Sequence, residues 1–228
     1  MRITIFGFLL LAVLWSCSDK SEVASKHPLA NYFYPYDTVA KVYLYRDVAH
    51  GLEEEFHRIY GLNDSYGHHI VVERYASDGR VLEAMNYNVD SLDVADHMVV
   101  DRFKKKEKAI LYKTPIFPWK VGEKTWFASK FHGVTDSTLI LKEIKRKALN
   151  LKKITVLEEQ KNALVCQDEI SMTVLNPFTK KEQSYTAKAK YFFADGIGLC
   201  EWYNRDKSVH FRLEKILTQK EWLKIIAR

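Results

Sequence analysis

The sequence predicts a mainly β protein, built as a large curved antiparallel sheet or half-barrel meander with a C-terminal helix. The first observation is alternation. Apolar and polar residues follow each other with period two along most of the chain after residue 36, and turn residues separate the alternating segments. This combination is typical of antiparallel strands. The second observation is the large number of such segments, since many twisted strands seldom form a flat sheet.

The first half of the chain contains a well-marked hairpin. Strands are predicted over residues 69–76 and 81–87, with Asp78-Gly79 between them. This pair tolerates the positive φ that a tight hairpin turn requires. Two earlier strands, over residues 39–46 and 55–60, flank Gly51 and are rich in β-branched and aromatic residues, which favour strands.

The middle of the chain continues the meander. Strands are predicted over residues 98–103, 109–113, 124–131, 137–147 and 153–158. Pro115 and Pro118 interrupt this region. Because proline cannot donate a hydrogen bond to a strand ladder, residues 114–122 are predicted to form a loop or an edge crossing.

The last third has the most regular pattern. Strands are predicted over residues 164–174, 185–193, 197–204 and 209–216, with turns at Asp195-Gly196 and at residues 204–207. Alternate residues from Tyr185 to Phe193 are apolar, whereas Lys188 and Lys190 lie on the other side. One face of this strand is therefore predicted to be buried and the other solvated.

A capping box predicts the C-terminal helix. Thr218 is followed three residues later by Glu221, and each of these side chains can satisfy a free backbone amide at a helix start. The helix is predicted to span residues 219–227. Its apolar residues, predicted to face the core, are Trp222, Leu223, Ile225 and Ile226.

Composition indicates a single folded domain over residues 36–228. Hydrophobic residues make up 47% of the chain and charged residues 28%, with 13 Tyr, 12 Phe and 5 Trp. These values are globular and exceed what a disordered chain contains. The net charge is +6, but the lysines are scattered. A nucleic-acid partner is therefore not expected.

The N-terminus has the layout of a cleaved export signal. Arg2 precedes an unbroken apolar run from Ile3 to Trp15, and Ser16-Cys17 then leads into a polar stretch. A helix needs about 20 apolar residues to span a bilayer, so this shorter run indicates the hydrophobic region of a signal peptide.

The segment Leu14-Trp15-Ser16-Cys17 resembles the lipobox of bacterial lipoproteins, although Trp15 is bulkier than the residues usual there. Together with the polar tail after it, it makes the chain look like the envelope lipoproteins of the Bacteroidota type. The resemblance implies a signal peptide over residues 1–16, a lipid on Cys17 that holds the protein in a membrane, and a flexible tether over residues 17–35. Ser18, rather than aspartate, after the cysteine favours the outer membrane. The alternative is an ordinary secretory signal with an incidental cysteine.

The other two cysteines leave a disulfide open. Cys166 and Cys200 form an even pair once Cys17 carries lipid, and an exported protein enters an oxidising compartment. Each also lies within a predicted strand, and free cysteine is itself among the most buried residue types. Both a Cys166–Cys200 bridge and two buried thiols are consistent with the sequence.

Two clusters of metal-ligand residue types are present. His57, His68, His69 and Glu73 have side chains that zinc accepts, but His68 points away from His69 on a strand. The second cluster consists of Asp90, Asp93, Asp96 and Asp101. It lacks the spacing and central glycine of a calcium loop. Solvated or capping side chains are the preferred interpretation of both, and no metal or cofactor is predicted.

No pattern of an enzyme stands out. The chain has no Gly-x-Ser-x-Gly elbow, and neither Cys166 nor Cys200 has a histidine beside it. The sequence therefore predicts a lipid-anchored, non-enzymatic envelope protein that acts by binding or as an accessory to an envelope protein partner.

Two alternatives remain. The first is a carrier whose curved sheet shelters a lipid or acyl chain, which requires an apolar cavity without a buried charge. The second is a hydrolase that depends on carboxylates or a metal, which requires converging Asp, Glu or His side chains in one cleft. An aromatic set near the N-terminus could line a ligand groove or fill the core: Tyr32, Phe33, Tyr34, Tyr36, Tyr43 and Tyr45.

Overall fold

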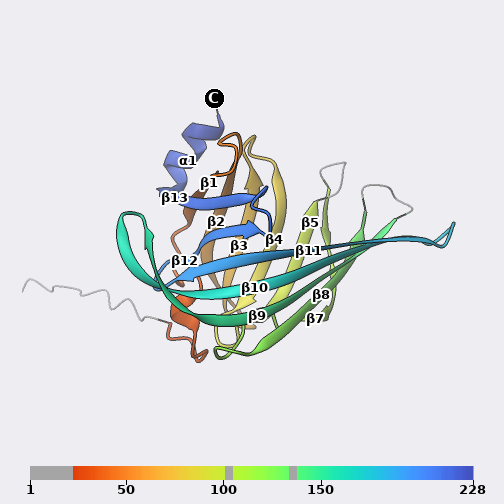
Figure 1. Cartoon of the computed structure of the whole chain (residues 1–228), viewed down its shortest axis with the longest axis horizontal. Helices are drawn as coiled ribbons and strands as arrows, with labels where there is room; N and C mark the ends of the chain where they lie inside the picture. The colour runs from red at the N-terminus through yellow and green to blue at the C-terminus, as the bar shows by residue number, and fades with distance from the viewer. Residues whose placement is uncertain (1–22, 101–104, 134–137, 228) are drawn as a thin grey trace, which may run out of the picture.

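The computed structural model describes residues 23–100, 105–133 and 138–227. The predicted signal peptide, residues 1–16, and Cys17 lie outside these ranges. Within them the chain forms one antiparallel sheet of 13 strands and a C-terminal helix (Figure 1). The predicted fold class is confirmed.

The strands follow one another as hairpins. They are β1 (Lys41–Asp47), β2 (Glu54–Asp64), β3 (Gly67–Ala76), β4 (Val81–Asn88), β5 (Val94–Val100), β6 (Lys106–Lys108), β7 (Ile110–Lys113), β8 (Lys124–His132), β9 (Leu139–Val156), β10 (Glu159–Asn176), β11 (Lys181–Ala194), β12 (Gly198–Asn204) and β13 (His210–Thr218). A short 3₁₀ helix, η1 (Ala30–Tyr32), precedes them, and α1 (Gln219–Ile226) follows.

The order of the strands makes the sheet curl round on itself. It runs β6-β5-β4-β3-β2-β1-β13-β12-β11-β10-β9-β8-β7, so β1 pairs with β13 and the two edge strands, β6 and β7, are separated only by Ala109. Backbone hydrogen bonds hold the edges together, from Val94 N to Thr114 O at 3.0 Å and from Ala109 N to His97 O at 2.8 Å. The curved sheet therefore has an inner face.

The N-terminal segment packs on the sheet, which corrects part of the predicted tether. Residues 23–35 belong to the predicted flexible region 17–35, yet Phe33 and Tyr34 are buried in the main core. Gly198 makes this approach feasible, since a Cβ there would lie 2.6 Å from Tyr34 Cδ1. The sequence alone could not show that Phe33 and Tyr34 fix this segment to the sheet, because the contact with Gly198 joins parts that lie far apart in the chain.

Helix α1 packs on the sheet through one side. Its capping box is formed as predicted, with Thr218 accepting from the Glu221 amide and Glu221 accepting from the Thr218 amide. Trp222 is buried against Val42, Leu44 and Phe56. Leu223 and Ile225 are exposed, contrary to the prediction. A two-turn helix lying on the outside of a sheet has room for only a narrow contact face.

The long strands β9, β10 and β11 differ most from the prediction. The two strands predicted over residues 137–147 and 153–158 are one strand, β9, that ends in a turn at Leu157-Glu158. Both turn residues have positive φ without being glycine, so no glycine marked the turn in the sequence. The buried face predicted for residues 185–193 begins only near Tyr191, because none of the described residues covers the outer part of β11, and Tyr185 is 62% exposed.

Candidate functional site

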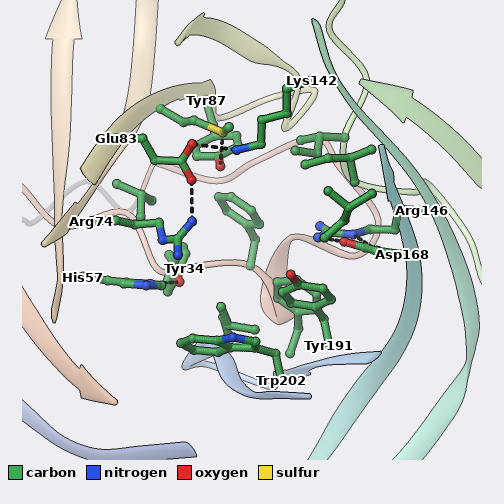
Figure 2. A pocket seen from close by; sticks show the side chains of 18 residues that line it. Tyr34, His57, Arg74, Glu83, Tyr87, Lys142, Arg146, Asp168, Tyr191 and Trp202 are labelled. Atoms are coloured by element: carbon green, nitrogen blue, oxygen red, sulfur yellow. Dashed lines mark hydrogen bonds and ion pairs between the residues drawn. The ribbon is translucent and has the colours of Figure 1, made fainter. Parts of the chain in front are cut away.

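The inner face of the sheet surrounds a cavity of about 280 Å³ (Figure 2). Its walls combine aromatic, aliphatic and charged side chains from both halves of the chain. The lining residues are Phe33, Tyr34, His57, Val72, Arg74, Glu83, Met85, Tyr87, Ile116, Lys142, Ile144, Arg146, Asp168, Ile170, Tyr191, Phe193, Leu199 and Trp202.

Strand periodicity explains why these residues point inward. Successive side chains of a strand alternate between faces, so Lys142, Ile144 and Arg146 of β9 line the cavity together. The same alternation directs Glu83, Met85 and Tyr87 inward from β4. Charged residues at these positions would be interpreted from sequence as solvent-facing, which is why the site was missed.

Glu83 is the centre of a charged cluster on one wall. It accepts a hydrogen bond from Lys142 Nζ at 2.6 Å and one from Arg74, and His97 Nε2 lies 3.2 Å from it. Burial opposes ionisation of this carboxyl, but Lys142 and Arg74 outweigh burial and hold its pKa well below the ordinary value. Glu83 is therefore ionised, and it joins β4 to β9 across the interior.

A second chain of hydrogen bonds extends from Arg74. Its Nε donates to Glu55 at 2.6 Å, Glu55 lies 2.6 Å from His57 Nε2, and His57 Nδ1 is 3.1 Å from the Tyr34 hydroxyl. Burial lowers the pKa of His57. Burial opposes ionisation of Glu55 too, but Arg74 and His57 lower its pKa to about 2. Neutral His57 thus donates from Nε2 and accepts from Tyr34 at Nδ1.

Arg146 and Asp168 form an ion pair on the opposite wall. They face each other across β9 and β10, and two bonds of 2.8 and 2.7 Å join the guanidinium to the carboxylate. Both side chains are buried. The guanidinium also lies 5.3 Å from the ring centre of Tyr191 and 5.0 Å from that of Phe193. Such a bidentate, ring-stacked arginine has a fixed orientation.

Aromatic rings complete the lining. Tyr191 and Trp202 lie together on one side of the cavity, as Figure 2 shows. Trp202 stacks on Phe211 with ring centres 5.0 Å apart, and Phe33 packs edge-on against Tyr87 at 4.9 Å. These rings present fixed apolar surface to the cavity. Of the aromatic set near the N-terminus, Phe33 and Tyr34 line the cavity, whereas Tyr43 and Tyr45 fill the core.

Ser129, His97 and Glu83 lie in the order of a catalytic triad. His97 Nδ1 is 3.0 Å from Ser129 Oγ, and His97 Nε2 is 3.2 Å from Glu83. However, Ser129 and His97 are both 0% exposed, and neither belongs to the cavity lining. A triad serine must reach a substrate carbonyl. This group instead ties β5, β8 and β4 together.

Of the two possibilities left open for Cys166 and Cys200, the structure shows the two buried thiols and no bridge between them. They lie on β10 and β12, with β11 between them. Neighbouring strands are about 4.8 Å apart, so two such spacings exceed the roughly 7 Å limit between bridged Cα atoms. Burial raises the pKa of each thiol to about 12. Cys17, the predicted lipidation site, lies outside the described residues.

The histidine cluster of the first half is dispersed. His57 faces the cavity, whereas His68 contacts the Tyr36 hydroxyl at 3.3 Å and His69 lies 3.3 Å from Asp64. Glu73 is bound by Arg58 on the outer face. The aspartates are also separated, with Asp90 paired to Lys26 and Asp96 to Lys108, and Asp101 lies outside the described ranges. The described residues contain no group of three such side chains placed to hold a metal.

Comparison with known proteins gives no family. No family model and no curated protein matches the chain. One similar solved structure is a "putative lipoprotein" from Parabacteroides distasonis, with a TM-score of 0.47, 10% identity, and coverage of 81% of this chain and 97% of that one.

A second is a "putative exported protein with YmcC-like fold" from Bacteroides fragilis, with a TM-score of 0.45, 13% identity, and coverage of 81% and 98%. Both TM-scores are below 0.5. Among the described residues, no helix has the length and apolar character needed to cross a membrane.

Proposed function

We propose that the protein is a lipid-anchored cell-envelope protein, held in the outer membrane, whose folded domain binds a small molecule in its interior cavity without catalysing a reaction. One observation supports binding above all: aromatic rings and a few converging polar groups line a hollow on the inner face of the sheet. This composition is the usual one of small-molecule sites.

The export signal and Cys17 support the anchor. Because the chain packs on the sheet from its first described residues, only the segment between Cys17 and Val23 would separate lipid from domain. The six Cα-to-Cα steps from Cys17 to Val23 extend to about 20 Å at most. The domain would therefore be held close to the bilayer surface, rather than at the end of a long tether.

The two alternative functions have less support. A carrier of lipid acyl chains requires an uncharged cavity, whereas Arg74, Glu83, Lys142, Arg146 and Asp168 line this one. Its volume of about 280 Å³ is also slightly below the roughly 300–1,000 Å³ that ligand sites occupy, which leaves little room for a long acyl chain. A hydrolase that depends on carboxylates requires Asp or Glu side chains that are free to act on a substrate, whereas Glu83 is held by Lys142 and Arg74 and Asp168 by Arg146.

Metabolic labelling tests the anchor. Cells expressing the full chain are grown on a clickable fatty acid, and the purified protein is assayed for label. Wild type and Cys200→Ser should both be labelled, since Cys200 is a buried thiol, while Cys17→Ser should carry none. Equal labelling of Cys17→Ser and wild type would show that the proposed anchor is wrong.

A further inference from the structure

Three cationic side chains face the cavity with donors to spare. Arg74 donates through Nε and Nη1, Arg146 through Nε and Nη2, and Lys142 through one bond to Glu83. An arginine has five N–H donors and a lysine three. Among the described residues, Arg74 Nη2 and Arg146 Nη1 have no hydrogen-bond partner, and 35% of the Arg74 side chain is uncovered.

The acceptors of the same walls are largely occupied. Glu83 already accepts from Arg74, Lys142 and His97. Asp168 is 1% exposed and holds Arg146 through both oxygens. Although the ion pairs balance in formal charge, the groups that reach the cavity are mostly donors. A molecule rich in acceptors satisfies them, and a molecule rich in donors does not.

The cations lie on two sides of the hollow. Figure 2 shows Arg74 and Lys142 near Glu83, and Arg146 across from them beside Asp168. Between them the lining is apolar and includes Tyr191, Trp202 and the buried Ile144. Charge-assisted hydrogen bonds are roughly twice as strong as neutral ones, so the arrangement favours a charged acceptor joined to an apolar body.

We propose that the ligand is a small organic anion, in which a carboxylate or phosphate group binds Arg74, Lys142 and Arg146 and an apolar body packs on Tyr191 and Trp202. This assignment rests on the proposed binding function and names its ligand class. The two headgroups share the same chemistry, namely negatively charged oxygens that accept hydrogen bonds from the cations.

Calorimetric titration of the purified mature domain tests the ligand class with matched probes. The probes are 3-phenylpropionate against 3-phenylpropanol, octanoate against octanol, and phenyl phosphate. Each anion should bind at least about tenfold more tightly than its alcohol, equivalent to about 1.4 kcal/mol. The comparison of phenyl phosphate with 3-phenylpropionate then separates a phosphate ligand from a carboxylate ligand.

A double variant locates the binding site. Arg146→Gln with Asp168→Asn removes a cation and leaves no unpaired buried charge, and it should weaken anion binding at least about tenfold while leaving alcohol binding unchanged. The control is Arg58→Gln with Glu73→Gln, which removes an ion pair between β2 and β3 on the outer face. It should change neither the affinity for the anions nor the affinity for the alcohols. If the first double variant fails to fold by circular dichroism, Lys142→Gln provides the same comparison.

Three outcomes overturn the proposal. Equal binding of anions and alcohols rejects the anionic ligand class but leaves the binding function standing. Unchanged anion affinity in the cavity variants places the anion elsewhere on the protein. Failure of every probe to bind at millimolar concentration rejects the ligand class and the binding function together.

Discussion

Strands β9, β10 and β11 pass through two different environments. In the body of the protein, Ala163–Cys166 of β10 and Phe192–Ala194 of β11 are buried. Farther along the same strands, residues 181–188 are all exposed, and the β10–β11 hairpin projects from the molecule (Figure 1). Backbone pairing and hydroxyl pairs such as Thr173–Ser184, at 2.9 Å, hold this projecting hairpin.

The difference shows that alternation identifies the faces of a strand but not what covers them. In the body, Arg146 and Asp168 face inward although they are charged, because each satisfies the other. In the projecting hairpin, Tyr185 is exposed although its ring is apolar, because no element of the described chain packs on it. The covering element, and not the local pattern, decides burial.

The largest expected effect comes from breaking the buried ion pair. Asp168→Ala leaves the Arg146 guanidinium buried and unpaired, so the free energy of unfolding should fall by about 3–5 kcal/mol. Replacing both residues, as in Arg146→Met with Asp168→Leu, should cost less than about 1 kcal/mol, since no isolated charge remains. Urea denaturation measures both, and equal losses would contradict the argument.

A pair of substitutions on β11 compares the two environments directly. Phe193 is buried against Phe117 and Arg146, so Phe193→Ala should lower the free energy of unfolding by about 3–5 kcal/mol. Tyr185→Ala, on the same strand, should change it by less than about 0.5 kcal/mol. If Tyr185→Ala proves as costly as Phe193→Ala, then something covers the projecting hairpin in solution.

Acid should lower the free energy of unfolding through Glu55 and His57, which lie beside the cavity. The pKa of Glu55 is lowered from 4.5 to about 2. The stabilisation that ionised Glu55 gives the folded state is therefore complete above pH 5 and is lost as pH falls towards 2. This amounts to about 3 kcal/mol at about 1.4 kcal/mol per pKa unit. Burial lowers the pKa of His57 below 6.5, so below that pH the unfolded chain gains protons that the folded one does not.

Both groups therefore make the free energy of unfolding fall on acidification. Urea titrations at pH 7, 5 and 3 measure this loss. Glu55→Gln should remove most of the decrease in the free energy of unfolding below pH 5. Glu54 is a partly exposed neighbour on β2, and Glu54→Gln should leave this decrease in place. An unchanged slope in Glu55→Gln would show that other carboxyl groups carry the acid sensitivity.

The parts of the structure that depend on near neighbours were predictable from sequence. The hairpin turn at Asp78-Gly79 and the capping box of Thr218 and Glu221 both form as predicted. The cavity was not predictable, because it depends on contacts such as Lys142 with Glu83, which lie 59 positions apart. Local pattern does not indicate which distant strand will supply the opposite charge.

The pairing of β1 with β13 has a consequence for how the protein matures. Lys41 lies opposite Thr218, so β1 gains its second neighbour only after the chain has been made up to β13. Topologies that join distant parts of a chain in this way fold slowly. For the export that we propose, such a delay is useful, because a polypeptide that cannot yet close its sheet stays extended enough to thread through a narrow translocation channel.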